Sequence, residues 1–98
     1  MSVLAKRLKE ARIRADLSQE RLGLEAGLDA MSASARMNRY EKGNRVPSLE
    51  LVERIAKVLK VPAAYFYAED DETAELLIAF HRLNKAARSR VMSAIREE

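Results

Sequence analysis

The chain has 98 residues, 48% hydrophobic and 34% charged, a composition that favours one small folded domain over a disordered segment or a two-domain enzyme. It has no cysteine, which excludes disulfides and thiolate metal sites, and no apolar run near the roughly 20 residues that cross a bilayer, so we expect a cytoplasmic protein. The net charge is +3, but residues 1–61 carry 13 Lys and Arg against 8 Asp and Glu, which makes this part the candidate surface for a polyanion.

The first two predicted elements are an amphipathic helix over residues 3–15 and a short helix over residues 19–26. Ser18 is placed to cap the second helix, because its hydroxyl can accept a hydrogen bond from a backbone N–H two or three residues later. Gly27 follows as the residue expected to take a left-handed conformation in a tight turn. The apolar residues of the first helix recur at spacings of four, three and four: Leu4, Leu8, Ala11 and Ala15.

A third helix is indicated by helical spacing over residues 35–41, with Met37 and Tyr40 facing inward, and it should end near Gly43. The start of this helix is open, because either Asp29 or Ser32 could cap it. A start at Asp29 would lengthen the helix by a turn. A later start would leave residues 29–33 as a loop.

Residues 44–47 are predicted to form a loop, after which Ser48 caps a fourth helix. Pro62 fits the first turn of a short fifth helix that ends at Phe66, since its missing N–H would be unpaired there. Val61 and Tyr65 should close the core together with Phe66. The apolar stripe of the fourth helix is predicted to consist of Leu49, Val52, Ile55, Ala56 and Leu59.

After the acidic residues 69–72, apolar residues continue at helical spacing to residue 95, with Asn84 as the cap after a break. We therefore divide the chain into a bundle of residues 1–68 and a helical extension of residues 69–98. The extension carries more apolar residues than the bundle needs, which makes it the candidate for dimerisation. The alternative is that it folds back over the first and fifth helices. The candidate dimerisation residues are Leu76, Phe80, Leu83, Val91 and Ile95.

Two short helices joined by a glycine turn, with a third packed behind them and a basic face in front, form a unit that can present one helix to DNA. The major groove is about 12 Å wide, which admits one helix with its side chains. The sequence therefore predicts an all-α protein that binds double-stranded DNA.

Over residues 4–66 the sequence resembles the lambda-repressor and Cro-like helix-turn-helix regulators, also called the XRE family. The resemblance implies a five-helix lambda-repressor-like bundle, here with an extra C-terminal helical segment, whose third helix contacts bases. The segments that carry it are Leu8-Lys-Glu-Ala-Arg12, Leu17-Ser-Gln-Glu-Arg-Leu22, Ala26-Gly-Leu28, Asn38-Arg-Tyr-Glu-Lys-Gly43 and Pro47-Ser-Leu-Glu50, with Ile55, Ala56 and Leu59.

Two positions depart from the family pattern. The step from Gly27 to Met37 is longer than usual by roughly one helical turn, about four residues, and the extra residues lie within residues 28–34. Gly23 stands where the family usually has Ala, which still meets the need for a small residue at a helix crossing.

On the third helix, the family positions that face bases are Ser34, Ala35, Arg36 and Arg39, with Asn38 beside them. Arg36 and Arg39 are three residues apart and so share one side of the helix. Arginine paired with guanine O6 and N7 is the commonest specific base contact. The alternative is that these arginines form ion pairs, for instance Arg39 with Glu41 or Glu50.

The resemblance also implies contacts to the DNA backbone. Gln19 would touch a phosphate at the start of the second helix, where the N–H groups beyond Ser18 attract an anion. Asn44 and Arg45 would bind the backbone from the loop after the third helix, through main-chain amides and basic side chains, and Lys42 could join them. The alternative for this loop is an ordinary solvated turn.

The expected function is transcriptional regulation, most simply repression, by a homodimer bound to an inverted-repeat operator with half-sites about one helical turn apart. The alternative is an antitoxin that neutralises a protein toxin and autoregulates its operon. An enzyme, a metal site and a cofactor are not expected, because the chain has one histidine, His81, and no glycine-rich phosphate loop. The acidic residues 70–72 are better interpreted as complements to a helix dipole than as an acid–base pair.

Overall fold

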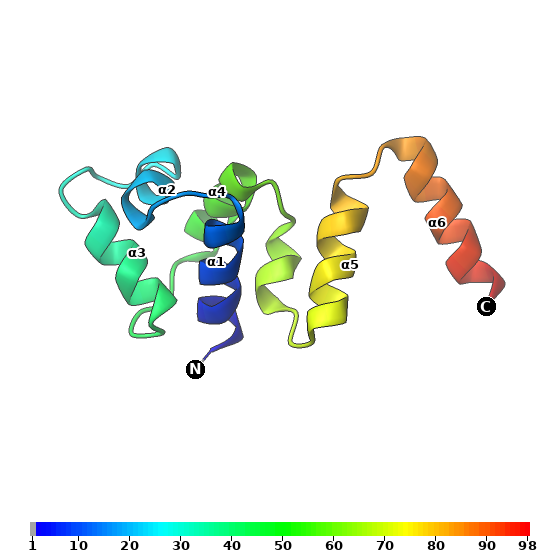
Figure 1. Ribbon diagram of the computed structural model, residues 1–98, viewed down its shortest axis with the longest axis horizontal. Helices are drawn as coiled ribbons and strands as arrows, with labels where there is room; N and C mark the ends of the chain where they lie inside the picture. Colours follow the sequence, from blue (N-terminus) through cyan, green and yellow to red (C-terminus); the bar gives the residue numbers. More distant parts are fainter. Residues whose placement is uncertain (1) are drawn as a thin grey trace.

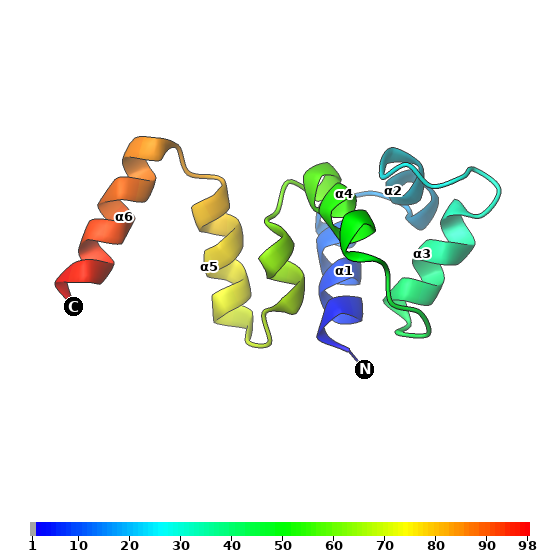
Figure 2. The ribbon, with the colours of Figure 1, turned by 180° about the vertical axis from the view of Figure 1, so that it is seen from behind.

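The computed structural model describes residues 2–98, and within that range the regular elements are all helices, with no strand (Figures 1 and 2). This confirms the predicted all-α bundle with an additional C-terminal segment. No helix of the described range is long and apolar enough to cross a membrane. The elements are α1 (Val3–Arg14), α2 (Gln19–Glu25), α3 (Ala33–Glu41), α4 (Leu49–Leu59), the 3₁₀ helix η1 (Ala63–Tyr67), α5 (Asp71–His81) and α6 (Lys85–Glu97).

The predicted helix caps are confirmed by their hydrogen bonds. Backbone N–H groups at the third helical position donate to the side chains of Ser18, Ser48 and Asn84 at 2.9, 3.1 and 2.9 Å. Gly27 has a φ of 91°, the left-handed conformation expected of a residue that ends a helix in a tight turn. These local rules therefore fix where α2, α4 and α6 begin and where α2 ends.

The core lies where α1, α2, α3, α4 and η1 meet. Val61, Tyr65 and Phe66 are buried in it, as predicted, and the rings of Tyr65 and Phe66 pack edge to face with centroids 5.3 Å apart. The cluster also contains Leu8, Leu22 and Met37, and from α4 it contains Leu51, Val52, Ile55, Ala56 and Leu59.

Two predictions about this region are wrong. Leu49 is 65% exposed, because α4 turns Leu51 rather than its first residue toward the core. Pro62 is not in the first turn of η1; it precedes that helix with extended backbone (φ −74°, ψ 150°). The fifth helix of the bundle is a 3₁₀ helix, and it ends at Tyr67, one residue after the predicted end at Phe66.

The C-terminal residues fold back onto the bundle only in part. Helix α5 folds back against η1, and its Ala74 and Ile78 belong to the same core cluster as the bundle. Helix α6 has no buried residue and extends away from the bundle (Figures 1 and 2). It is joined to α5 by Arg88, whose guanidinium donates to the carbonyls of Phe80 and His81 at 3.1 and 2.7 Å.

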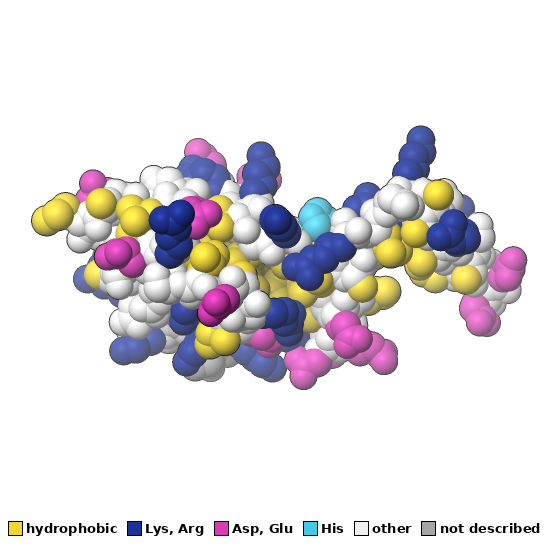
Figure 3. Space-filling view, turned by 45° about the horizontal axis from the view of Figure 1, so that its top comes forward, with side chains coloured by type: hydrophobic (Ala, Val, Ile, Leu, Met, Phe, Trp, Pro, Cys, Tyr) yellow, Lys and Arg dark blue, Asp and Glu magenta, His cyan; other side chains and the backbone are white. Residues whose placement is uncertain are grey.

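Hydrophobic side chains gather along the part of the surface that α5 and α6 form (Figure 3). Leu76 and Ile95 are 52% and 53% exposed. Phe80, Leu83 and Val91 are half-buried. All five candidate dimerisation residues therefore remain accessible in the single chain.

Arg7 holds the start of α5 against α1. Its side chain is only 1% exposed, and its guanidinium donates to the carbonyls of Ala68 and Glu69 and to the Asp71 carboxylate at 2.9, 3.1 and 2.9 Å. The bond from Arg7 and the charge of Lys6 lower the pKa of Asp71. The role of Arg7 could not be predicted from the sequence, because nothing local distinguishes it from the exposed basic residues around it.

Tyr65 completes the surroundings of Arg7. Its ring centroid lies 5.9 Å from the Arg7 guanidinium carbon, and its hydroxyl donates to the Glu10 carboxylate at 2.9 Å. Burial and this hydrogen bond raise the pKa of Tyr65 to about 12, so it stays a donor at neutral pH. The guanidinium is thus enclosed by two acidic groups, two carbonyls and an aromatic ring.

Replacing Arg7 by Met should lower the free energy of unfolding by about 2 kcal/mol, because the buried Ala68 carbonyl loses its donor and the bonds to Glu69 and Asp71 are lost as well. Urea denaturation at pH 7 measures this. The part of the stabilisation that comes from the bond between Arg7 and Asp71 is present above the unfolded-state pKa of Asp71, about 4. It is lost as the pH falls through the lower folded-state pKa, so the difference in stability between the wild type and the Arg7 variant should narrow in acid.

The matched control is Arg21→Met, because Arg21 is 67% exposed and, within residues 2–98, forms its ion pair with Glu25 alone. It should cost less than about 0.5 kcal/mol. Equal effects of the two substitutions would contradict a structural role for Arg7.

Candidate nucleic-acid interface

Helices α2 and α3 cross at Gly23. A Cβ on this residue would lie 2.9 Å from Ala33 Cβ and 3.2 Å from Met37 Cγ, closer than packed side chains allow. The buried surface of α3 therefore meets the backbone of α2 directly. At the end of α2 the N–H of Leu28 returns to the Gly23 carbonyl at 2.9 Å, which completes the turn.

The third helix begins late. Its first residue is Ala33, and Ser32 occupies the capping position without a side-chain hydrogen bond. Asp29 does not cap the helix, because its carboxylate accepts the N–H of Met31 at 3.0 Å within the turn before it. The extra residues thus form a loop over residues 28–32 and do not lengthen α3.

Helix α3 has a buried and an outward face. Ala33, Met37 and Tyr40 face the core, while Ser34, Ala35 and Arg39 are exposed and Arg36 and Asn38 are half-buried. The five predicted base-contacting residues therefore lie together on the surface of one helix.

Three arginines converge beside this face. Arg36, Arg39 and Arg45 line a pocket of about 300 Å³ with Tyr40, and no acidic residue lines it. The Arg36 guanidinium donates to the Tyr40 hydroxyl at 2.8 Å and lies 5.9 Å from its ring centroid, which sets its direction.

The ion-pair alternative for these arginines is not realised. Glu41 pairs with Arg12, and Glu50 pairs with Arg54. Across residues 2–98, Arg36 and Arg39 have no carboxylate within ion-pair distance. The pocket is therefore a site of uncompensated positive charge, which is the electrostatic requirement for holding a polyanion.

A buried ion pair fixes the other side of α3. The Glu41 carboxylate is 3% exposed and accepts from Arg12 Nε and Nη2 at 2.6 and 3.0 Å. Arg12 Nη1 also donates to the Leu17 carbonyl at 2.8 Å. The last residue of α3 is thereby joined to α1 and to the loop before α2.

The predicted contact residues Gln19 and Asn38 belong to the same network. The Gln19 amide donates to the Glu41 carboxylate and to Asn38 Oδ1 at 3.2 and 3.3 Å. Residues Ser18, Lys42, Asn44 and Arg45 are exposed. The main-chain N–H of Asn44 donates to the Arg39 carbonyl at 3.0 Å, so this amide is engaged in ending α3 and only the side chain faces outward.

Sequence reasoning did not assign two residues that lie beside the predicted contact residues, Lys9 and the buried Glu41. Glu41 comes four residues after Met37 and so lies on the buried side of the helix. A carboxylate at this position was the signal for a buried ion pair. Lys9 of α1 lines a second pocket with Gln19, Asn38 and Lys42, of about 740 Å³. The basic run of the first helix was the signal for Lys9.

The chain is similar to known proteins in sequence and in structure. Residues 3–65 match the family model described as a helix-turn-helix domain. The chain is also similar to the crystal structure of transcriptional regulator BswR: the two are 42% identical, the match covers 100% of this chain and 95% of that chain, and the TM-score is 0.90. No curated protein matches.

Replacing Glu41 by Gln should lower the free energy of unfolding by about 3 kcal/mol, because a mostly buried guanidinium would lose its countercharge. Chemical denaturation measures the loss. Glu50→Gln is the control, since the Glu50 side chain is 83% exposed and its pair with Arg54 should contribute less than about 0.5 kcal/mol. A Glu41 variant as stable as the Glu50 variant would contradict the role assigned to the buried pair.

Proposed function

This chain belongs to the helix-turn-helix domain family, and on that premise we propose that it is a sequence-specific transcriptional regulator of the lambda-repressor or Cro-like kind. The observation that carries the proposal is the outward face of α3, with two arginines free of carboxylate partners within residues 2–98. The likeness to the regulator BswR over the full length of this chain supports it.

In this proposal α3 enters the major groove. Arg36 and Arg39 donate to guanine O6 and N7, while Ser34 and Asn38 hydrogen-bond other base edges. Ala35 lies between them and is small enough to let the helix approach closely. Tyr40 supports the orientation of Arg36 through its hydroxyl and its ring.

The flanking residues bind the phosphates. One set, Lys42, Asn44 and Arg45, follows α3, and the other, Ser18 and Gln19, begins α2. The two sets meet where Lys42 and Gln19 line one pocket beside α3. Lys9 extends the second set from α1. Such contacts fix orientation and add affinity without distinguishing one sequence from another.

The α5–α6 segment serves dimerisation in this proposal. Its accessible apolar residues, Leu76, Phe80, Leu83, Val91 and Ile95, would pair with those of a second copy. A two-fold dimer matches an inverted repeat, and occupation of such an operator represses transcription when it overlaps a promoter.

Selection of bound sequences from random duplexes should return an inverted repeat. On the selected duplex, Arg39→Ala should cost about 1–3 kcal/mol of binding and relax the preference at one base pair, whereas Arg45→Ala should weaken selected and unrelated duplexes alike. Fluorescence anisotropy at fixed salt measures both. An Arg39 variant with unchanged sequence preference would overturn the assignment to bases.

The dimer is tested by sedimentation. The wild-type chain should sediment at twice its mass of 11.1 kDa, and a variant with Val91→Glu and Ile95→Glu should sediment as a monomer. Val46→Glu with Leu49→Glu is the control, because these exposed apolar residues lie outside α5 and α6. A wild-type monomer, or a dimeric α6 variant, would refute this role. Purification with a second protein bound to α6 would favour the antitoxin alternative.

A further inference from the structure

The loop between α2 and α3 carries an apolar side chain that the bundle does not use. Leu28 and Ala33, at its two ends, are 7% and 0% exposed, whereas Met31 between them is 94% exposed. The loop is therefore anchored in the core on both sides while its tip projects into solvent.

Hydrogen bonds within the loop set the position of Met31. Its N–H donates to the Asp29 carboxylate at 3.0 Å, and the Ser32 N–H donates to the Asp29 carbonyl at 3.1 Å. The backbone at the tip is thus held in a turn, with the thioether side chain directed outward.

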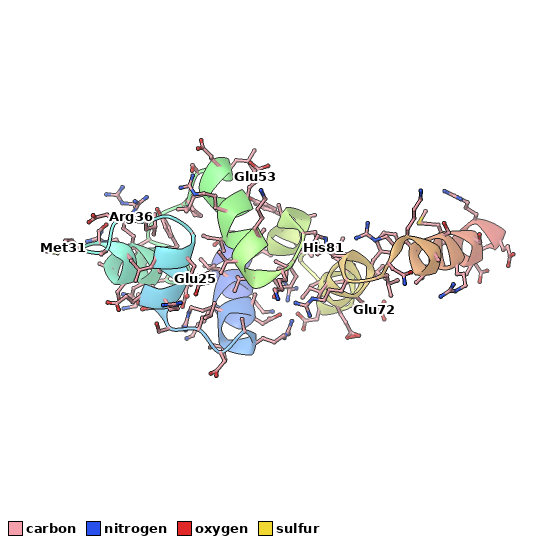
Figure 4. The ribbon with its side chains drawn as sticks, turned by 90° about the horizontal axis from the view of Figure 1, so that it is seen from above. Glu25, Met31, Arg36, Glu53, Glu72 and His81 are labelled. Carbon is pink, nitrogen blue, oxygen red and sulfur yellow. The ribbon has the colours of Figure 1, made fainter. Side chains whose placement is uncertain are left out.

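Met31 lies beside the face of α3 that the proposed function assigns to DNA. It precedes the first residue of α3 by two positions. Figure 4 shows Met31 and Arg36 at the same end of the molecule, with Met31 reaching farther from the bundle. A duplex whose major groove held the full length of α3 would therefore pass close to the tip of this loop.

The chemistry of the loop favours a base over a phosphate. Residues 28–32 contain no Lys or Arg, and their one charged group is the Asp29 carboxylate, which would repel a phosphate. The apolar group that the major groove offers is the C5-methyl of thymine, and apolar side chains contact it. An unbranched thioether can adapt its shape to such a contact.

We propose that Met31 is a specificity-determining residue that packs against a thymine methyl group at the edge of the half-site, next to the start of α3. The inference rests on the proposed function, which supplies the duplex. It assigns to the extra loop residues a direct contribution to sequence preference.

The test uses the duplex obtained by selection, with each thymine replaced in turn by uracil, which lacks only the methyl group. At one position in each half-site, uracil should weaken wild-type binding about 4-fold, the effect of one methyl group removed from apolar contact. Met31→Gln, which keeps the length of the side chain, should bind the thymine duplex about as weakly and be indifferent to uracil there. Met31→Leu should retain the sensitivity.

Thermal unfolding should be the same for all three proteins, since the side chain is almost fully exposed. Specific binding that no uracil substitution weakens, or a Met31→Gln protein as sensitive as wild type, would overturn this inference and leave the proposed function intact. A wild-type protein that selects no sequence would overturn both.

Discussion

The orientation of α3 depends on the buried ion pair between Arg12 and Glu41. A helix of nine residues is too short to be stable alone, where about 12–15 are needed, so contacts outside the helix must determine its position. One side of α3 is fixed by close packing of Ala33 on Gly23, and its last residue by the bidentate bond to Arg12. The outward residues can then be exposed without loss of order.

A second arginine of α1 has the corresponding role on the opposite side of the bundle. Arg7 binds the carbonyls of Ala68 and Glu69, so the direction of α5 is set by α1. Helix α1 thus holds the surface assigned to DNA through Arg12 and the surface assigned to dimerisation through Arg7. If both proposals hold, this one helix connects the two surfaces, while the Arg88 contacts between α5 and α6 also set the separation of two α3 helices in a dimer.

The sequence was most informative where structure depends on neighbours in the chain. Ser18, Ser48 and Asn84 were identifiable as caps, and Gly27 as a turn residue, because a hydroxyl, an amide or a missing Cβ acts within a few residues. The outward face of α3 followed from helical periodicity once Met37 and Tyr40 were assigned to the core. Leu49 was misassigned because it is the first residue of its helix, where periodicity says little about which side is covered.

Features that depend on distant partners could not be predicted. Arg7 and Arg12 belong to a run of basic residues whose pattern is that of a solvated helix face. The partners of Arg7 lie 61 to 64 residues away in the chain, and the partner of Arg12 lies 29 residues away. The start of α3 was ambiguous because Asp29 and Ser32 are equally suitable caps in isolation, and the burial of Ala33 against Gly23 decides between them. The most direct test is the distance between the Arg39 guanidinium and the nearest base edge in a crystal of the chain with its selected duplex. If α3 contacts bases, this distance is that of a hydrogen bond, about 3 Å, in the major groove. A complex in which α3 faces solvent, with Arg39 far from every base, would contradict this role of α3.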